Sequence, residues 1–137
     1  MAETVRRVSY FYTMAPDKPV EGAKALGVLR DAGVNLLAFS GFPVGKRSQL
    51  DFVPEDPERF RAVAKAAKWK VKGPKTAFLI EGDDRTGVCA GILARLAAAK
   101  VNVTATDAVV AGAGRFGALL WVKPRDVKKA AQALGAA

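Results

Sequence analysis

The chain of 137 residues contains no histidine and only one cysteine, Cys89. A lone cysteine cannot form a disulfide within the chain, and without imidazole or a second thiol the common zinc sites cannot be built. The same absences exclude the Ser-His and Cys-His nucleophile pairs that most hydrolases use. We therefore expect no metal, no cofactor and no catalytic activity, and we interpret Cys89 as a small buried helix residue.

Long apolar runs are also missing, because no stretch reaches the roughly eighteen consecutive apolar residues of a membrane-spanning helix. The opening residues, MAETVRRVSYFY, lack the apolar core and cleavage site of a signal peptide. Half of the residues are nevertheless hydrophobic (50%), so the chain can bury a core. These features predict a cytoplasmic globular protein that does not bind membranes.

Acidic residues are scarce relative to basic ones, 13 against 22, which gives a net charge of +9. Such an excess favours nucleic acid, an anionic surface or an acidic ligand as partner. Charge alone does not choose among these three.

The sequence repeats itself at an offset of 67 residues. Residues that match at this offset include Asp17 with Asp84, Leu26 with Leu93, Leu29 with Leu96, Val34-Asn35 with Val101-Asn102, Gly45 with Gly112, and Pro57 with Pro124. The matches continue without a gap, so we predict an internal duplication, with residues 1–72 as the first unit and residues 73–137 as the second.

Both repeats predict the same order of elements. Short apolar runs rich in aromatic and β-branched residues, at 8–14 and 76–82, predict strands, and each precedes a helix with apolar residues at three- and four-residue steps. Two further strands follow, and a closing helix begins at Pro57 or Pro124. The order is βαββα, and residues 70–75 are either a linker or a fourth strand of the first unit. The prediction is an α+β fold of two such units, with helices on one face of an antiparallel sheet.

A polar elbow joins the first strand of the second repeat to its helix. Asp83 or Asp84 can cap the free amides of the helix, and Gly87 allows another group to approach the backbone closely. An ordinary cap and tight turn is one interpretation. The other is an anion site, since a helix N-terminus offers unpaired donors and partial positive charge. Asn35 and Asn102, repeated before the second strand of each unit, are turn residues or ligand contacts.

These residues also carry a resemblance to a known family. The segment DRTGVCAGILARLAAAKVNVTAT resembles the signature of the ACT domain, an amino-acid-binding regulatory module, and DKPVEGAKALGVLRDAGVNLLAFS is similar to it. The resemblance implies two ferredoxin-like βαββαβ units side by side and an amino acid held at a seam between units. It also implies an allosteric regulator that forms a homodimer or acts on a partner protein.

The resemblance further implies which residues contact the ligand. The elbow supplies backbone amides to the ligand carboxylate, while an elbow side chain and the Asn receive the ligand amine. The positions in this chain are Asp84, Arg85, Gly87, Val88 and Asn102 in the second repeat, and Asp17, Lys18 and Asn35 in the first. Because Val20 replaces the expected glycine in the first repeat, we expect the second elbow to be the better site.

A nucleic-acid-binding protein is the alternative. Residues 59–75 contain seven basic residues and no acidic one, and RNA-binding domains share this sheet topology. However, Phe52, Phe116 and Trp121 do not form the aromatic motif of RNA-recognition sheets, so we do not expect nucleic acid as partner.

Overall fold

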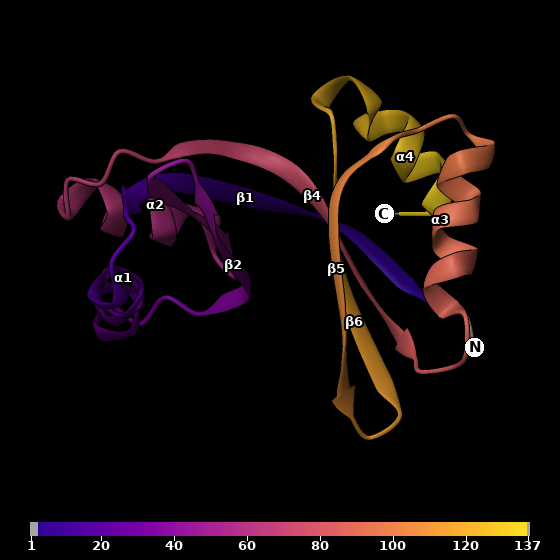
Figure 1. Cartoon of the computed structure of the whole chain (residues 1–137), viewed down its shortest axis with the longest axis horizontal. Coiled ribbons are helices and arrows are strands. Elements are labelled where there is room, and N and C mark those ends of the chain that lie inside the picture. The colour runs from indigo at the N-terminus through magenta and orange to yellow at the C-terminus, as the bar shows by residue number, and fades with distance from the viewer. Residues whose placement is uncertain (1–2, 137) are drawn as a thin grey trace. The chain divides into compact units, whose positions relative to one another are not determined.

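The computed structural model describes residues 3–136 and has the predicted α+β fold (Figure 1). Its elements, in chain order, are β1 (Thr4–Pro16), α1 (Pro19–Asp31), β2 (Leu36–Val44), β3 (Arg47–Pro54), α2 (Pro57–Ala66), β4 (Lys72–Asp83), α3 (Val88–Ala98), β5 (Val103–Gly112), β6 (Arg115–Val122), the short 3-10 helix η1 (Pro124–Asp126) and α4 (Val127–Leu134). The predicted order of elements is thus confirmed. No helix of residues 3–136 is long and apolar enough to span a membrane.

The strands follow the order β2-β3-β1-β4-β6-β5 in a six-stranded sheet. Four strand pairs are antiparallel: β1 with β3, β2 with β3, β4 with β6 and β5 with β6. Two strands, β2 and β5, form the edges. A continuous antiparallel sheet of two repeated units is therefore the architecture of this chain.

The chain forms two compact units that divide β1 and β4 between them. The first unit is Ser9–Lys75, and the second consists of the residues up to Val8 together with those from Thr76 onward. The predicted boundary lies between residues 72 and 73, with all earlier residues in the first unit. The difference arises because β1 is 13 residues long and its two ends serve different cores: Val5 packs in the second unit and Phe11 in the first.

Each unit thereby obtains a fourth strand. In the second unit, which lacks a last strand of its own, the start of β1 lies beside the end of β4, where a Cβ on Gly82 would be 3.3 Å from Cα of Glu3. In the first unit, the start of β4 lies beside β1, because Gly73 faces Tyr10 and Phe11. The interpretation of residues 70–75 as a fourth strand rather than a linker is thus confirmed for β4 from Lys72 onward.

The core of the second unit lies between its sheet and two helices. Val88, Ile92 and Leu96 of α3 are buried, at the three- and four-residue steps predicted for this helix, whereas Leu93 is 40% exposed. They pack against the inward residues of β6 and against Ala130, Ala131 and Leu134 of α4, which lies on the same side of the strands as α3 (Figure 1).

The first unit has an aromatic core. Phe60 of α2 stacks on Phe11 with ring centroids 4.8 Å apart and lies 5.3 Å from Phe52. Pro57 begins α2, as predicted, and the Asp56 carboxylate accepts a hydrogen bond from the Arg59 amide at 3.2 Å. This capping interaction satisfies one free donor of the helix N-terminus.

Candidate functional site

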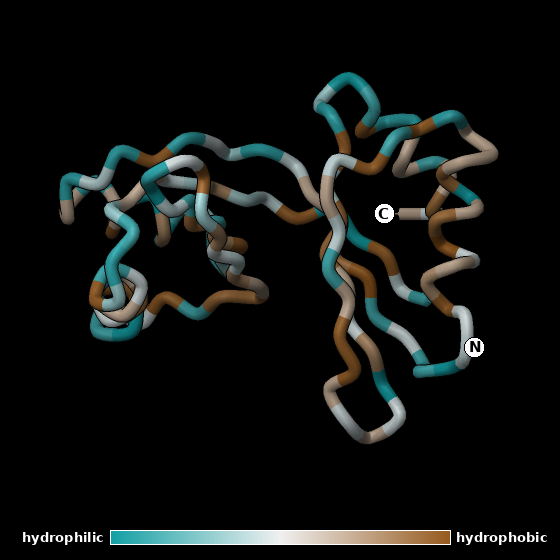
Figure 2. Tube along the Cα trace, viewed as in Figure 1, coloured by the Kyte–Doolittle hydropathy of each residue, from teal (hydrophilic) through white to brown (hydrophobic). Residues whose placement is uncertain are grey.

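The elbow of the second unit is an exposed turn of four residues, Asp84–Gly87, between β4 and α3. It is hydrophilic, and the hydrophobic residues resume in α3 (Figure 2). The Asp84 amide donates to the carbonyl of Gly114 at 2.8 Å, which ties the elbow to the turn between β5 and β6. Backbone bonding therefore holds the elbow at one end of the sheet.

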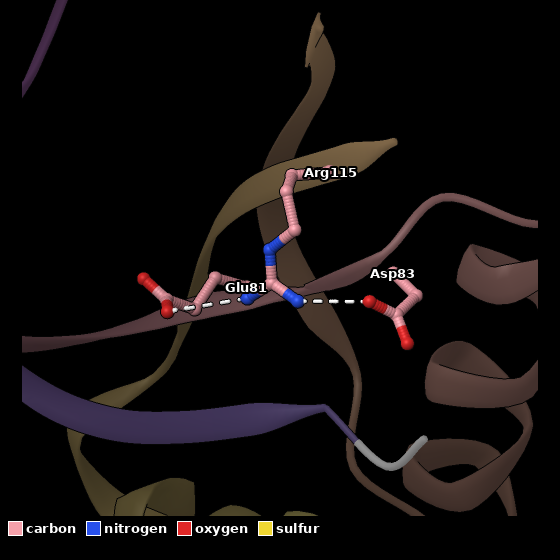
Figure 3. A network of polar contacts seen from close by, with 3 residues as sticks. All are labelled: Glu81, Asp83 and Arg115. Carbon is pink, nitrogen blue, oxygen red and sulfur yellow. Dashed lines mark hydrogen bonds and ion pairs between the residues drawn. The ribbon is translucent and has the colours of Figure 1, made fainter. Parts of the chain in front are cut away.

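Neither aspartate caps α3, so the predicted cap is wrong. Asp83 instead accepts a hydrogen bond at 3.0 Å from the guanidinium of Arg115, its register partner in β6. The other guanidinium nitrogen lies 3.4 Å from Glu81, so Arg115 bridges two carboxylates of β4 (Figure 3). No side chain caps α3, so the amides of Cys89 and Ala90 in its first turn keep their capacity to bind an anion, whereas the Val88 amide donates to the carbonyl of Arg85.

Gly87 is the N-cap of α3 and has a φ of 79°, in the left-handed region. A Cβ at this position would meet nothing within 4 Å, so the conformation and not close packing requires glycine. The Val88 side chain is 6% exposed and belongs to the core. The Val88 amide donates to the carbonyl of Arg85 at 3.2 Å, and the buried Val88 side chain cannot select a ligand.

Arg85 contacts Glu3, an acidic residue that is not among the predicted site residues. Its guanidinium lies 3.6 Å from Glu3 Oε2, while Arg95 of α3 donates to Glu3 Oε1 at 2.9 Å. The Glu3 side chain is only 10% exposed. The elbow is therefore attached to the start of β1 by charge, through residues too far apart in sequence for a local pattern to connect.

Asn102 lies at the opposite end of the unit from the elbow. Asp83, next to the elbow, pairs with Arg115, whereas Val103, next to Asn102, pairs with Val122, seven residues further along β6. At about 3.3 Å per residue the two ends are roughly 23 Å apart. A single unit therefore cannot place Asp84 and Asn102 on one small ligand.

The first unit repeats this separation. Its elbow follows Pro16, which pairs with Arg47, and Asn35 precedes Leu36, which pairs with Pro54 at the other end of β3. Within this unit Asp17 accepts a hydrogen bond from Ser48 at 3.0 Å, and the Asn35 amide donates to Glu55 at 3.2 Å. Both polar side chains thus have partners inside the chain.

The first elbow also offers fewer donors than the second. Lys18 is the N-cap of α1 and Pro19 follows it, so one amide of the first turn is absent. Val20, at the expected glycine position, is 60% exposed and not packed away. The first turn of α1 therefore has fewer free amides than that of α3, and the second elbow as the better site stays a prediction.

The aromatic residues of the RNA-binding alternative are not available for stacking on bases. Phe52, Phe116 and Trp121 are 0%, 4% and 6% exposed. Of the basic residues at 59–75, Arg59 donates to the carbonyl of Ala32, Arg61 lies 3.8 Å from Glu58, and Lys75 lies over the Tyr12 ring. An RNA-recognition sheet of the usual kind therefore does not fit this chain.

Among residues 3–136, no group of three cysteine or acidic side chains is placed to hold a metal ion. Cys89 is a free thiol, partly buried against the core of the second unit. Its packing agrees with the interpretation as a small helix residue.

Asp51 of β3 is a buried carboxylate, 5% exposed. Burial raises the pKa of Asp51, and the hydrogen bond from the Gln49 amide at 2.9 Å opposes that shift. Burial also raises the pKa of Tyr10, and the Asp51 charge raises it further. Burial thus disfavours the charged form of Asp51 in the folded state.

The raised pKa of Asp51 predicts how stability depends on pH. The folded state binds the Asp51 carboxyl proton more tightly than the unfolded state does. The resulting contribution to the free energy of unfolding is fully present below the ordinary carboxyl pKa of about 4 and is lost as pH rises through the raised pKa. Asp51→Asn should raise the Tm at about pH 7 by a few degrees and flatten the fall of Tm above about pH 4. Thermal denaturation across pH measures this. The exposed Asp107→Asn is the control, and an equal effect of both variants would contradict the prediction.

No protein-family model and no curated protein matches this sequence. Solved structures do match. Protein BT0572 from Bacteroides thetaiotaomicron has a TM-score of 0.81 at 16% identity, over 97% of this chain and 88% of that one. The regulatory subunit of aspartate kinase from Thermus thermophilus, in its ligand-free form, has a TM-score of 0.65 at 15% identity, over 98% and 95%. The structure of aspartokinase alpha and beta subunits has a TM-score of 0.67 at 16% identity, over 98% of this chain and 95% of that one.

These similarities extend over nearly the whole chain, while the identities are low enough that they show the fold alone. Three of the matched structures are described as a regulatory subunit or a regulatory domain of aspartate kinase, and 94–95% of their lengths is covered. The predicted fold is therefore confirmed: the chain has the tandem ACT-like fold of aspartate kinase regulatory subunits.

Proposed function

We propose that this chain is a stand-alone regulatory protein that senses an amino acid at the elbow of its second unit. The observation that carries the proposal is the uncapped N-terminus of α3, with Gly87 in the left-handed region and open space above it. The likeness to regulatory subunits of aspartate kinase supports a regulatory function. In this proposal the protein acts in the cytoplasm and has no catalytic activity.

The elbow has suitable chemistry for the carboxylate end of a zwitterion. Amides of the first turn of α3 donate to the carboxylate, and the partial positive charge of the helix N-terminus adds attraction. Arg85 contributes a further positive charge after it exchanges Glu3, 3.6 Å away, for the ligand. The Asp84 carboxylate is exposed and accepts from the ligand amine.

Asn102 must come from a second copy of the chain if it is to contact the same ligand, because the two ends of one unit are too far apart. The edge strand β5 offers the means, since its residues from Thr104 to Gly112 are exposed, with Val109 and Val110 at 67% and 57%. Pairing two β5 strands antiparallel places the start of one beside the end of the other. The end of β5 lies at the elbow, through Gly114, so Asn102 of the second copy reaches it.

A ligand held between two copies couples binding to association. Amino acid binding then stabilises the homodimer, and by linkage the dimer binds the amino acid more tightly. A regulated partner protein that recognises only the dimer would receive the signal. This is how a chain without catalytic groups regulates another protein.

The first test is a thermal shift against all twenty amino acids. At one hundred times its Kd a specific ligand stabilises by about 2.7 kcal/mol, which raises the Tm by several degrees. Asp84→Ala and Asn102→Ala should each abolish the shift, while Asn35→Ala, at the matching position of the first unit, should preserve it. If no amino acid changes the Tm, the proposal is wrong.

A mixing experiment tests whether two copies share the site. Each single variant, Asp84→Ala or Asn102→Ala, lacks every complete site in its own homodimer. After the two are unfolded together and refolded, heterodimers contain one intact site, so about one site in four returns. Titration of the mixture with the amino acid measures this fraction. No recovery of binding on mixing would mean that Asp84 and Asn102 do not contact the ligand from two different copies. Loss of binding in Asn35→Ala would mean that β2, and not β5, lies at the interface between the two copies.

A further inference from the structure

A hollow of about 450 Å³ lies within the first unit, between the end of β1, helix α1 and the segment that joins α2 to β4. It contains none of the predicted ligand residues. The volume is within the usual range for small-molecule sites, about 300–1,000 Å³. Because its lining residues all lie in the first unit, the hollow is distinct from the proposed amino-acid site of the second unit.

The hollow has an apolar wall that is held in place. Met14, Val28 and Trp69 are among its lining residues. Trp69 is half-buried and stacks on Phe52 with ring centroids 6.0 Å apart and planes inclined by 19°. A ligand body that packs on this indole meets a ring whose orientation is already set, so little side-chain entropy is lost on binding.

Lysines surround this apolar wall. Lys24, Lys68 and Lys70 line the hollow, and Glu21 is the one acidic residue in the same lining. Among the described residues none of these three lysines forms an ion pair, since the ion pairs of the first unit join Arg30 to Asp31 and Arg61 to Glu58. The hollow thus carries an excess of positive charge that the chain leaves unpaired.

The backbone around these lysines is fixed by hydrogen bonds. The amides of Lys68 and Trp69 donate to Lys65 and Ala64 at the end of α2, at 3.0 and 2.9 Å, and Lys68 has a φ of 63°. The Thr13 hydroxyl donates to the carbonyl of Lys70 at 2.8 Å. The cationic residues are therefore presented by an ordered segment.

We propose that this hollow binds a small organic monoanion, a carboxylate with an aromatic or other apolar body. The apolar body packs on Trp69 and its neighbours, and the carboxylate is attracted by the three lysine ammonium groups. Glu21 disfavours anions but is outnumbered three to one. This binding activity is separate from the amino-acid sensing proposed above, and none of the predicted ligand residues of either elbow lines the hollow.

Phenylacetate is a suitable probe, with phenethylamine as its cationic counterpart of the same body. In ¹H–¹⁵N spectra of the full chain, the indole N–H of Trp69 should shift saturably with phenylacetate, and Trp121→Phe assigns the signal. Phenethylamine and acetate should cause at most a tenth of this effect at equal concentration. An equal response to phenethylamine would overturn the proposal, because charge would then not contribute.

A charge-matched pair of variants locates the site. Lys24→Gln, Lys68→Gln and Lys70→Gln combined should weaken phenylacetate binding at least tenfold. Lys100→Gln, Lys123→Gln and Lys128→Gln, exposed residues of the second unit, remove the same charge and should leave it unchanged. Equal loss in both would overturn the site. Asp84→Ala should keep the Trp69 response, so failure of the amino-acid proposal is distinguishable from failure of this one.

Discussion

Phe60→Ala is expected to lower the free energy of unfolding by about 3–5 kcal/mol. Phe60 is 0% exposed and packs between Phe11 and Phe52, and its ring centroid lies 6.4 Å from that of Trp69. Truncation removes the buried ring and leaves a cavity among side chains that stack on one another, so the neighbours cannot easily fill it. The helix α2 would then have only Ala64 as a fully buried anchor.

Urea denaturation followed by circular dichroism measures this loss. Phe42→Ala is the matched control, because Phe42 is 42% exposed on the edge strand β2 and its truncation should cost about 0.5 kcal/mol or less. If both variants lose the same stability, the aromatic cluster is not the core of the first unit.

The fold could be predicted from the sequence because its signals are local and repeated. The apolar run TAFLIEG lies in β4, the spacing of Val88, Ile92 and Leu96 gives the buried face of α3, and Pro57 begins α2. Each of these signals depends on residues a few positions apart. The offset of 67 residues then allowed the two halves to support each other.

The sharing of β1 could not be predicted in this way. The apolar run at 8–14 marks the strand, but β1 begins at Thr4 and includes the charged pair Arg6 and Arg7. Whether an extended segment pairs with one strand or another depends on contacts distant in sequence, and a local pattern carries no information about them. The second unit was therefore correctly predicted to lack a last strand, while the source of its fourth strand was not identified.

The sequence predicted where the elbow lies but not which residues contact it. Asp83 has the local signature of a helix cap, yet a hydrogen bond from Arg115, 32 residues away, satisfies it instead. Glu3 and Arg95 are 92 residues apart. The opposite positions of Asp84 and Asn102 follow from the parallel direction of the two strands that flank α3, which becomes plain only with the register.

Gly73→Ala is expected to lower the free energy of unfolding by about 3 kcal/mol or more. Gly73 has a φ of 125°, where L side chains are strained, and a Cβ would lie 2.7 Å from the carbonyl oxygen of Tyr10. The obstacle is backbone of the paired strand β1, so it cannot move aside as a flexible side chain would. Relief requires the start of β4 to separate from β1, which removes the fourth strand of the first unit.

Gly45→Ala is the control for a positive φ without a close backbone contact. Gly45 also has a positive φ, 62°, but a Cβ there would meet nothing within 4 Å. It should therefore cost only the conformational penalty, about 1–2 kcal/mol. Urea denaturation of both variants at equal pH measures the difference, which reports the close approach of β4 to β1 together with the more strained φ of Gly73. Equal losses would mean that this approach does not stabilise the first unit, and that β4 belongs in solution to the second unit alone.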